Sequence, residues 1–485
     1  MFQLQVVSPC RLQLATGNLY PDIMFDDTIA AIATPLGEGG LAVIRISGPR
    51  ALAVADQAFT PVGPHASKPS AAVSHTIHYG KVLRAGKQVD EVLCAVMRAP
   101  RTFTREDVVE ITCHGGILST KTVFDTVLEC GARPALPGEF TQRAFLNGRL
   151  DLAQAEAVAD LIHARTELAL SAANEQLAGK LSHRINQLRD ELMLTLAHIE
   201  AHIDFPEEDI APDTHAQLES RMARGIEFME DLLRTANEGQ ILRRGIRAAI
   251  IGRPNAGKSS LLNQLLGHDR AIVSPIPGTT RDTIEETASV RGIPVVFIDT
   301  AGLREAKDEI ETEGIRRSRE SLSKAELILH VLDASEPFHA EDEKLLAEFA
   351  AKKRIVVRNK IDLPQKLVFK SEIRNPKSEI VTLVDMCSKT GAGLEPLKDA
   401  IKALVWSGNI TAEMAQVTIN SRHQDALKRA SGSLRLALEA LRGNASLEFV
   451  ALDLRQGIAA VGEIVGKTTT EDLLDAVFSQ FCIGK

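Results

Sequence analysis

Cysteine is scarce in this chain of 485 residues, which holds six copies and no CxxC pair. The six are Cys10, Cys94, Cys113, Cys130, Cys387 and Cys482. This wide scatter indicates neither a zinc site nor a disulfide framework. We therefore expect the protein in a reducing compartment, the cytoplasm.

Long apolar runs are also missing. No run approaches the ~18 residues that a membrane-spanning helix needs, and the opening residues lack the basic head and apolar core of a secretory signal. We expect neither membrane insertion nor export. Residues 1–23 match no motif and are expected to form a disordered extension, with Met24 as an alternative initiator.

Aromatic side chains and surplus positive charge are lacking as well. Aromatic residues make up 4% of the chain, and the formal net charge is -8. These values argue against a base-stacking platform and against a protein that coats nucleic acid. Two short basic clusters remain as candidate contacts, although such clusters are more often solvated helix faces. They are Arg243, Arg244 and Arg247, and Arg316, Arg317 and Arg319.

The chain is long enough for about three domains of ~150 residues each. Short β-like runs at residues 41–46 and 108–112 predict an α+β domain over residues 24–147. Helical periodicity predicts two parts of one α-helical domain over residues 148–244 and 408–485, with one helical stretch at residues 215–238 in the first part. Between them, residues 245–407 alternate helical patterns with five apolar runs, at 248–251, 295–298, 327–332, 355–357 and 380–383. This alternation is typical of an α/β domain with a mostly parallel sheet, in which the five runs are strands. This order favours an α/β domain inserted into a helical one.

A complete GxxxxGK[ST] motif occupies residues 252–259, between a predicted strand at 248–251 and a helix that begins near Ser260. In this setting the motif predicts a phosphate-binding loop. Lys258 is expected to neutralise phosphate oxygens, and the Ser259 hydroxyl to bind Mg²⁺. The predicted nucleotide contacts of this loop are Asn255, Ala256, Gly257, Lys258, Ser259 and Ser260.

Further motifs follow in the order that a guanine-nucleotide site requires. They are Asp299, Thr300, Ala301 and Gly302 (DTAG), then Asn359, Lys360 and Asp362 (NKID), then Ser388 and Lys389. The Asp362 carboxylate can accept from the N1–H and exocyclic amine of guanine, whereas adenine presents the wrong donors. Thr280 lies where a switch segment is expected and offers a second hydroxyl to Mg²⁺.

This conjunction of motifs predicts a Mg²⁺-dependent GTPase, with GTP as the nucleotide. Residue 303, directly after DTAG, is Leu303, and a leucine cannot orient water as glutamine does in many GTPases. Another group must therefore assist hydrolysis. The last motif also departs from the usual SAK sequence, because Cys387 stands in front of Ser388 and Lys389.

Together with several longer stretches, these motifs resemble the tRNA modification GTPase MnmE (TrmE) family. The stretches are GRPNAGKSSLLN, GTTRD, DTAGLRE, NKID, TIAAIATPLGEGGLAVIRISGP, PGEFTQRAFLNGRLDLAQAEAVADLI, IDFPEEDI and the terminal FCIGK. The resemblance covers nearly the whole chain after Met24.

The resemblance implies a homodimer formed through the amino-terminal domains, and a G domain whose GTPase activity is switched on by K⁺. The implied K⁺ ligands are Asn255, Ser274, Ile276 and Thr279. Further implied nucleotide contacts are Ser274, Pro275, Ile276, Pro277, Gly278 and Thr279. Glu311 matches the position that orients the attacking water, and with Lys258 and Thr280 it completes the implied catalytic set.

For the amino-terminal domain the resemblance implies binding of 5-formyl- or 5,10-methylene-tetrahydrofolate. The matching residues are Arg45, Glu110, Arg149 and Lys485. Basic side chains suit the folate carboxylates, and Glu110 suits the amino-pyrimidine edge of the pterin. Cys482 is an additional candidate nucleophile, although no base is adjacent to it in the sequence.

The function implied is modification of C5 of the wobble uridine of certain tRNAs to (carboxymethyl)aminomethyluridine. The partner would be an FAD-containing protein of the MnmG/GidA family, in a heterotetramer. The alternative, suggested by the G domain alone, is a GTP-dependent switch in ribosome assembly without carbon transfer.

Overall fold

The computed structural model describes residues 26–63, 67–204, 212–269, 286–298, 322–368, 382–406 and 418–485. The predicted extension over residues 1–23 lies outside these residues. The chain forms two compact units. Of the described residues, the first contains 26–34, Glu38–Leu150 and Leu474–Lys485, and the second contains Pro35–Gly37 and those within Asp151–Leu473. Helical periodicity alone groups Leu474–Lys485 with the helices before them in sequence. The contacts of these residues place them in the first unit instead.

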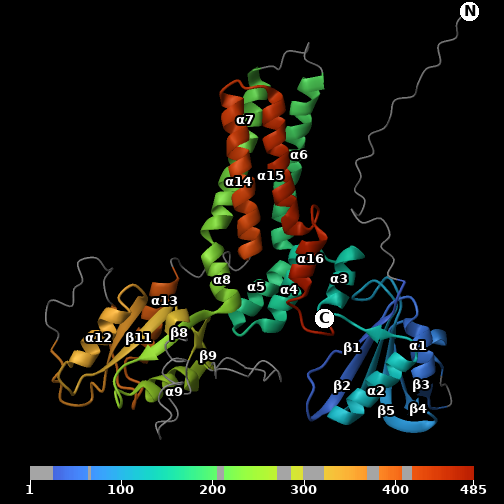
Figure 1. Ribbon diagram of the computed structural model, residues 1–485, viewed down its shortest axis with the longest axis horizontal. Coiled ribbons are helices and arrows are strands. Elements are labelled where there is room, and N and C mark those ends of the chain that lie inside the picture. The colour runs from blue at the N-terminus through green and yellow to red at the C-terminus, as the bar shows by residue number, and fades with distance from the viewer. Residues whose placement is uncertain are drawn as a thin grey trace, which may run out of the picture. The chain divides into compact units, whose positions relative to one another are not determined.

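The first unit is built on a seven-stranded sheet of order β3-β4-β5-β6-β2-β1-β7 (Figure 1). Its neighbouring strands are antiparallel, except that β1 and β7 are parallel. The strands are β1 (Ile29–Ile32), β2 (Gly39–Ser47), β3 (Phe59–Pro61), β4 (Thr76–Arg84), β5 (Lys87–Met97), β6 (Val108–Gly115) and β7 (Arg133–Pro134). The helices are α1 (Ala51–Ala58), η1 (Pro69–Ala71), α2 (Ile117–Glu129), α3 (Glu139–Leu146) and most of α16 (Glu471–Phe478).

Side-chain alternation along β2 and β6 separates a core face from a second face of this sheet. Ile44, Ile46 and Ile111 are buried in one cluster with residues of α1 and α2. Successive residues of a strand point to opposite faces. Arg45 and Glu110 therefore lie on the face away from α1 and α2, and they stand opposite each other in the β2–β6 register.

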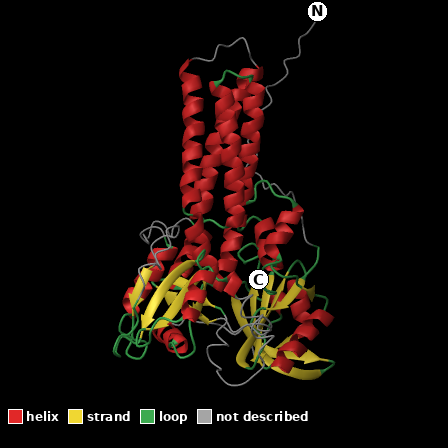
Figure 2. Cartoon of the chain, turned by 60° about the vertical axis from the view of Figure 1, so that its left-hand side comes forward, coloured by secondary structure: helices red, strands yellow, loops and turns green. Residues whose placement is uncertain are grey.

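Four long helices of the second unit pack side by side (Figure 2). They are α6 (Lys180–Asp204), α7 (Pro212–Arg234), α14 (Ser421–Arg442) and α15 (Leu447–Val465). Their shared core draws on leucine and isoleucine from both helix pairs and on methionine from α7, although about two hundred residues of sequence lie between α7 and α14. Among the described helices, none combines the length and apolar character that crossing a bilayer requires.

Three shorter helices accompany the bundle: α4 (Leu152–His163), α5 (Glu167–Leu177) and α8 (Ala236–Arg244). Asp151 caps α4 by accepting from the Gln154 backbone N–H, and the Gln154 side chain bonds back to the Asp151 backbone. A single helix was expected from His215 to Glu238, but the chain turns at Thr235 and forms α7 and α8 instead.

Between α8 and α14 in sequence lies the α/β body, a six-stranded sheet of order β13-β12-β11-β8-β10-β9 with its helices. The strands are β8 (Ile246–Ile251), β9 (Glu286–Val290), β10 (Ile293–Phe297), β11 (Leu327–Asp333), β12 (Lys353–Asn359) and β13 (Thr382–Asp385). The helices are α9 (Lys258–Asp269), α12 (Ala340–Glu348) and α13 (Leu394–Val405). All strands run parallel except β9, which pairs antiparallel with β10. The five strands expected from apolar runs overlap β8, β10, β11, β12 and β13, and β9 is an additional edge strand.

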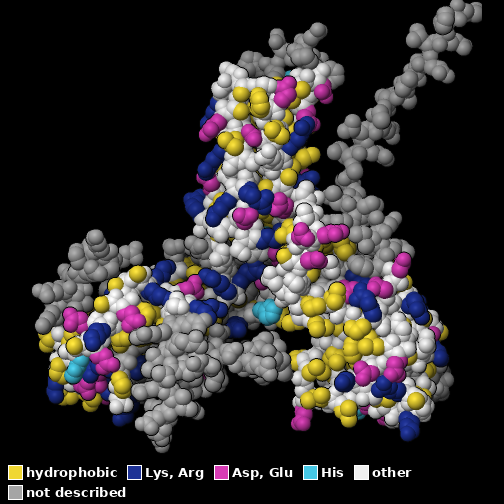
Figure 3. Space-filling view, in the orientation of Figure 1, with side chains coloured by type: hydrophobic (Ala, Val, Ile, Leu, Met, Phe, Trp, Pro, Cys, Tyr) yellow, Lys and Arg dark blue, Asp and Glu magenta, His cyan; other side chains and the backbone are white. Residues whose placement is uncertain are grey.

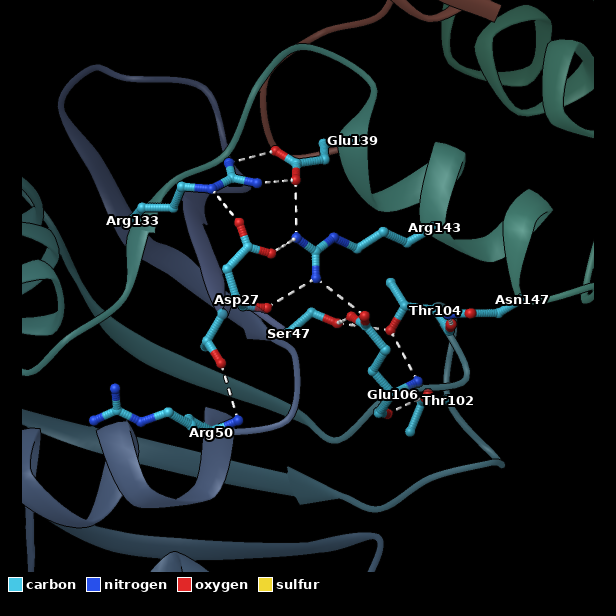
Figure 4. Close-up of polar contacts among 11 residues, drawn as sticks. Asp27, Ser47, Arg50, Thr102, Thr104, Glu106, Arg133, Glu139, Arg143 and Asn147 are labelled. Carbon is cyan, nitrogen blue, oxygen red and sulfur yellow. Dashed lines mark hydrogen bonds and ion pairs between the residues drawn. The ribbon is translucent and has the colours of Figure 1, made fainter. Parts of the chain in front are cut away.

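A buried arginine ties α3 to the sheet of the first unit (Figure 4). The Arg143 side chain has no exposed surface. Its Nη2 lies 2.6 Å from Asp27 Oδ1 and 2.9 Å from Glu139 Oε1, and its Nη1 lies 3.0 Å from Glu106 Oε1. Arg133 bridges the same Asp27 and Glu139 carboxylates. This network orients α3 because each carboxylate accepts from at least one guanidinium.

Two carboxyl groups of this network, those of Asp27 and Glu139, titrate below their usual range. Burial alone would raise the pKa of Glu139 and of Asp27, but hydrogen bonds from Arg133 and Arg143 outweigh it and lower both values. A carboxyl with a lowered folded pKa contributes stability above its ordinary pKa, and that stability is lost as pH falls through the folded pKa. The network therefore weakens below about pH 4.

We predict that Glu139→Gln lowers the unfolding temperature of the first unit at pH 7, because the buried Arg143 guanidinium loses a carboxylate partner. The free energy of unfolding should fall by about 3 kcal/mol or more. The difference from the unchanged protein should narrow at pH 3.5, where the network itself is weakening. Differential scanning calorimetry at the two pH values measures both effects.

The matched control is Glu129→Gln, which removes the exposed partner of Arg84 on α2. Exposed ion pairs contribute ~1 kcal/mol or less. An equal loss in both variants would contradict the assigned role of Arg143 and Glu139.

Candidate functional site

The loop between β8 and α9 carries the residues of the predicted phosphate site. Gly252 has φ +148°, and a Cβ there would lie 2.2 Å from the Val331 carbonyl oxygen. Gly257 has φ +99°, and a Cβ there would lie 2.1 Å from the Asn359 side-chain nitrogen. Both glycines of the motif are therefore required by close neighbours and by left-handed backbone.

Lys258 is the first residue of α9, and its ammonium group folds back over the loop. Its Nζ donates to the carbonyl oxygens of Gly252, at 2.9 Å, and Arg253, at 2.8 Å. Burial lowers the pKa of Lys258, while the nearby Glu341 acts in the opposite direction. The first N–H groups of a helix lack intrahelical acceptors. A half-buried cation and a helix N-terminus thus meet at one point, where an anion is favoured.

Asn359 joins the phosphate loop to the loops expected to hold the base. It is 1% exposed at the end of β12. Its Nδ2 donates to the Ala256 carbonyl oxygen at 2.8 Å, and its Oδ1 accepts from both the backbone N–H and the hydroxyl of Ser388 at 2.9 Å. One side chain therefore sets the spacing of three of the predicted motifs.

The remaining residues of the NKID segment are held by neighbouring strand ends. Lys360 Nζ lies 2.6 Å from Asp333 Oδ2, at the end of β11. Burial would raise the pKa of Asp333, but hydrogen bonds from Lys360 and Ser335 lower it. The thiol of Cys387 donates to Asp362 Oδ1 at 3.1 Å. Asp362 itself is exposed, as a carboxylate that must meet a ligand should be.

The structure also places four other predicted nucleotide residues. Asn255 is exposed and has φ 61°, and Lys389 is exposed beside Ser388. Ser259 and Ser260 lie in the first turn of α9. Several predictions fall outside the described residues. They are Ser274, Pro275, Ile276, Pro277, Gly278, Thr279, Thr280, Asp299, Thr300, Ala301, Gly302, Glu311 and the basic residues Arg316, Arg317 and Arg319.

A second cluster of predicted residues meets at the carboxyl end of the chain, within the first unit. Arg45 Nε donates to Glu110 Oε1 at 2.8 Å, and Arg45 Nη1 donates to the Gly484 carbonyl oxygen at 3.2 Å. Burial lowers the pKa of Lys485, as does the charge of Arg45, while Glu110 and Cys482 act in the opposite direction. Arg45, Glu110 and Lys485 are thus brought together from β2, β6 and the tail.

Two aromatic rings link this cluster to Arg149. The Arg45 guanidinium lies 5.7 Å from the ring centre of Phe140, and the Arg149 guanidinium lies 5.0 Å from that of Phe103. Phe103 packs against the small core that contains Phe140. Arg149 also donates to the Thr102 carbonyl oxygen at 2.6 Å. It is therefore a neighbour of the cluster through the rings, without a contact to Arg45.

The tail itself is seated by backbone contacts. Gly138 N–H donates to the Cys482 carbonyl oxygen at 3.4 Å, and a Cβ on Gly138 would lie 2.5 Å from the Phe478 carbonyl oxygen. The rings of Phe478 and Phe481 are 5.6 Å apart. Cys482 is exposed, and no described residue gives its thiol a hydrogen bond.

Two of the three arginines of the described basic cluster form ion pairs. Arg243 pairs with Asp160 and Arg244 with Glu326, each at 2.7 Å. On the face drawn in Figure 3, basic and acidic side chains are mixed along the helical bundle. This arrangement favours the solvated or structural interpretation of the cluster over a nucleic-acid contact.

Sequence reasoning missed the supporting residues Asp333, Phe103 and Phe140. Asp333 ends a strand next to NKID, so strand order would have been the signal. The two phenylalanines carry no local pattern, because only the fold brings them beneath the arginines.

We predict that Cys387 holds Asp362 in the orientation that guanine needs. Cys387→Ala should weaken GDP binding about threefold to tenfold, because one hydrogen bond contributes ~1 kcal/mol, while Cys387→Ser should keep the affinity. The preference for GDP over IDP should fall in the alanine variant, because IDP lacks the exocyclic amine that Asp362 binds. Competition against a fluorescent GDP analogue measures both. Equal behaviour of the alanine and serine variants would contradict the role.

The chain is similar to one protein family along nearly its whole length. Residues 152–482 match the family model of the MnmE helical domain, and residues 28–149 match that of the GTP-binding protein TrmE N-terminus. The tRNA modification GTPase MnmE of Geobacter metallireducens is 46% identical over 463 residues, which cover 95% of this chain and 99% of that protein. The protein of the same description from Geobacillus thermodenitrificans is 47% identical over 464 residues, covering 95% and 99%.

The tRNA modification GTPase MnmE of Bacillus subtilis is 45% identical over 464 residues, with 95% of this chain and 100% of that protein covered. Among solved structures, the G domain of the T. maritima FeoB iron transporter is 28% identical and covers 33% of this chain and 98% of its own, with a TM-score of 0.25, too low to bear on the assignment. The near-complete matches to relatives settle the family: the chain belongs to the tRNA modification GTPases of the MnmE family.

Proposed function

We propose that this chain is a K⁺-dependent GTPase that modifies C5 of the wobble uridine of certain tRNAs to (carboxymethyl)aminomethyluridine. It acts with an FAD-containing partner of the MnmG/GidA family and takes the added carbon from a tetrahydrofolate. The observation that carries the proposal is the side chain of Asn359, which holds the phosphate loop and the guanine-reading loops together in a member of this family.

The described residues fit a metal-bound guanine nucleotide. Lys258 and the first turn of α9 offer positive charge and N–H donors to phosphates, and the Ser259 hydroxyl stands beside Lys258 as a ligand for Mg²⁺. Asp362 is exposed and oriented by Cys387 for the base. When bound, Mg²⁺ and K⁺ supply charge that stabilises the transferring phosphoryl group.

Asn255 is the described residue proposed to bind K⁺. It is exposed and adopts φ 61°, a left-handed conformation that asparagine tolerates better than most residues. An amide oxygen is a hard ligand of the kind that such cations prefer. A cation held there takes the place of an arginine finger, which agrees with leucine at position 303.

The cluster at the tail fits a folate. Arg45, Arg149 and Lys485 offer cationic groups for the glutamate carboxylates. Glu110 accepts from Arg45 through Oε1, and no described residue donates to its Oε2, which is left for the amino-pyrimidine edge. Phe140 and Phe103 provide flat apolar surfaces beneath the two arginines.

A homodimer through the first unit is part of this proposal. The face of the sheet that carries Arg45 and Glu110 also presents Ile77, Tyr79 and Leu93, which are 69%, 47% and 45% exposed. Tyr79 and Leu93 stand opposite each other in the β4–β5 register. Contiguous exposed apolar side chains on one sheet face are typical of an interaction surface.

The direct test is the tRNA of a deletion strain complemented with variants of this chain. The unchanged chain should restore the modified uridine, measured by mass spectrometry of tRNA hydrolysates. Glu110→Gln should restore less than a tenth, because a charged hydrogen bond contributes ~1.5–3 kcal/mol. Glu129→Gln removes an exposed carboxylate on α2, on the other side of the sheet, and should restore the full level.

A deletion strain that keeps its full level of modified uridine would contradict the proposal. Accumulation of precursor ribosomal RNA in that same strain would then favour a role in ribosome assembly.

For K⁺ we predict GTPase rates at least ~10-fold higher in K⁺ than in Na⁺, since removing one group that stabilises transition-state charge commonly lowers rates by that much or more. Asn255→Lys should abolish the difference while binding a fluorescent GDP analogue normally. Equal rates in the two salts, or an unaltered K⁺ response in the variant, would exclude K⁺ activation at this position.

A further inference from the structure

Two acidic residues of α4 face both of the chain segments that connect the bundle to the α/β body. Glu156 and Asp160 lie four residues apart, so they share one face of the helix. The incoming connection is α8, which leads through Gly245 into β8. The outgoing connection is residues 418–424, which end in the first turn of α14.

Glu156 binds the outgoing connection in a nearly dry site. Its side chain is 8% exposed, and it accepts from Arg422 Nε at 2.8 Å and Nη2 at 2.9 Å. His423 Nε2 lies 2.8 Å from the second oxygen of Glu156, and the His423 ring is fully buried. Arg422 also donates to the carbonyl oxygens of Glu463, at 2.7 Å, and Ile464, at 3.0 Å, at the end of α15.

The hydrogen bonds of His423 assign its proton. Burial lowers the pKa of His423, while the Glu156 carboxylate acts in the opposite direction. Nδ1 accepts from the Asn420 backbone N–H at 3.3 Å, and the Asn420 side chain caps α14 by accepting from the His423 N–H at 2.8 Å. Nε2 therefore carries the hydrogen and donates to Glu156.

Asp160 binds the incoming connection. Its Oδ1 accepts from Arg243 Nε and Nη2 at 2.7 Å, near the end of α8, and its side chain is 15% exposed. Directly after α4, Arg165 Nη1 donates to the Thr287 hydroxyl on β9 at 2.7 Å. Ala172 of α5 lies in the same core as β8 and β10. The α4–α5 pair thus contacts the α/β body as well as its two connections.

The two connections also touch each other. A Cβ added to Gly239 on α8 would lie 2.9 Å from the Ile419 carbonyl oxygen and 3.2 Å from its nitrogen. Gln240 donates to the Gln424 side chain at 3.3 Å. The incoming and outgoing segments therefore run against each other, with α4 bound to both.

Buried ion pairs of this kind specify an arrangement more than they stabilise it, since apolar residues of equal volume often stabilise as well or better. We propose that Glu156 and Asp160 are positioning residues that clamp both connections of the α/β body to α4. A change in the position of that body is then passed to α4, which follows in sequence directly from the first unit. This transmission to α4 rests on the proposed function, because it would couple GTP hydrolysis to tRNA modification.

The test uses Glu156→Gln and Asp160→Asn in the full chain, with Glu200→Gln as control. Glu200 pairs with Arg455 at 2.7 Å on the exposed surface of the bundle, where a carboxylate is lost without touching the clamp. We expect amide hydrogen exchange at residues 236–244 and 418–424 to become at least tenfold faster in the clamp variants. Affinity for a fluorescent GDP analogue and the K⁺-stimulated GTPase rate should stay within twofold, while restored modified uridine falls at least tenfold. The control should match the unchanged chain.

Unchanged exchange at both segments overturns the clamp, as does full uridine modification despite faster exchange. A parallel fall in nucleotide affinity overturns it too, because the residues would then act through general stability. If the unchanged chain restores no modified uridine, the proposed function fails, while the exchange measurement still decides the clamp. Asp160→Asn, at the more exposed of the two carboxylates, carries the test if Glu156→Gln does not fold.

Discussion

The nucleotide site depends on one buried amide. Asn359 ends the strand β12 and reaches across to the phosphate loop after β8, while its oxygen holds the turn that follows β13. The strand β8 is far from β12 and β13 in sequence, but the carboxyl ends of all three meet at one edge because they are parallel. The amide leaves no room for a side chain at residue 257, which explains the second glycine of the motif. The loops expected to bind the phosphates and the base are therefore held together by one side chain.

In the first unit, opposite charges lie on the sheet face that α1 and α2 do not cover. Alternation along β2 and β6 sends the aliphatic residues to α1 and α2, and it leaves Arg45 and Glu110 on the other face. The carboxyl-terminal tail then adds Lys485, since its backbone is held at Gly138 and at Arg45. The buried network of Arg143, Arg133, Asp27 and Glu139 keeps α3 in register beside this cluster. Stability and the proposed folate site thus share the same short helix.

In the second unit, ion pairs join the helical part to the α/β body. The bundle core is mainly apolar, whereas the joint with the α/β body is made by Glu156, Asp160 and their arginine partners. A purely apolar joint would tolerate sliding, because apolar contacts have no direction. The bidentate contact between Arg422 and Glu156 has one geometry, and it fixes where the outgoing chain begins α14. Because the ion pairs have a fixed geometry, we assign this joint a role in transmitting movement of the α/β body to α4.

Several features followed from the sequence by itself. The phosphate loop, the NKID segment and the five parallel strands were predictable because each depends on local spacing, which nearest neighbours in the chain determine. The same holds for the α+β and helical character of the flanking segments. The limits of single helices were less predictable, as the turn at Thr235 shows, because helix ends respond to packing.

Only the tertiary structure decided which distant residues meet. It placed Leu474–Lys485 with the first unit, set Cys387 against Asp362, and stacked Arg149 on Phe103 rather than beside Arg45. It also turned the basic cluster at Arg243 into part of a joint, since its partner Asp160 lies 83 residues away in sequence. Local patterns carry no record of such pairs, because a contact between distant segments depends on how every element between them is packed.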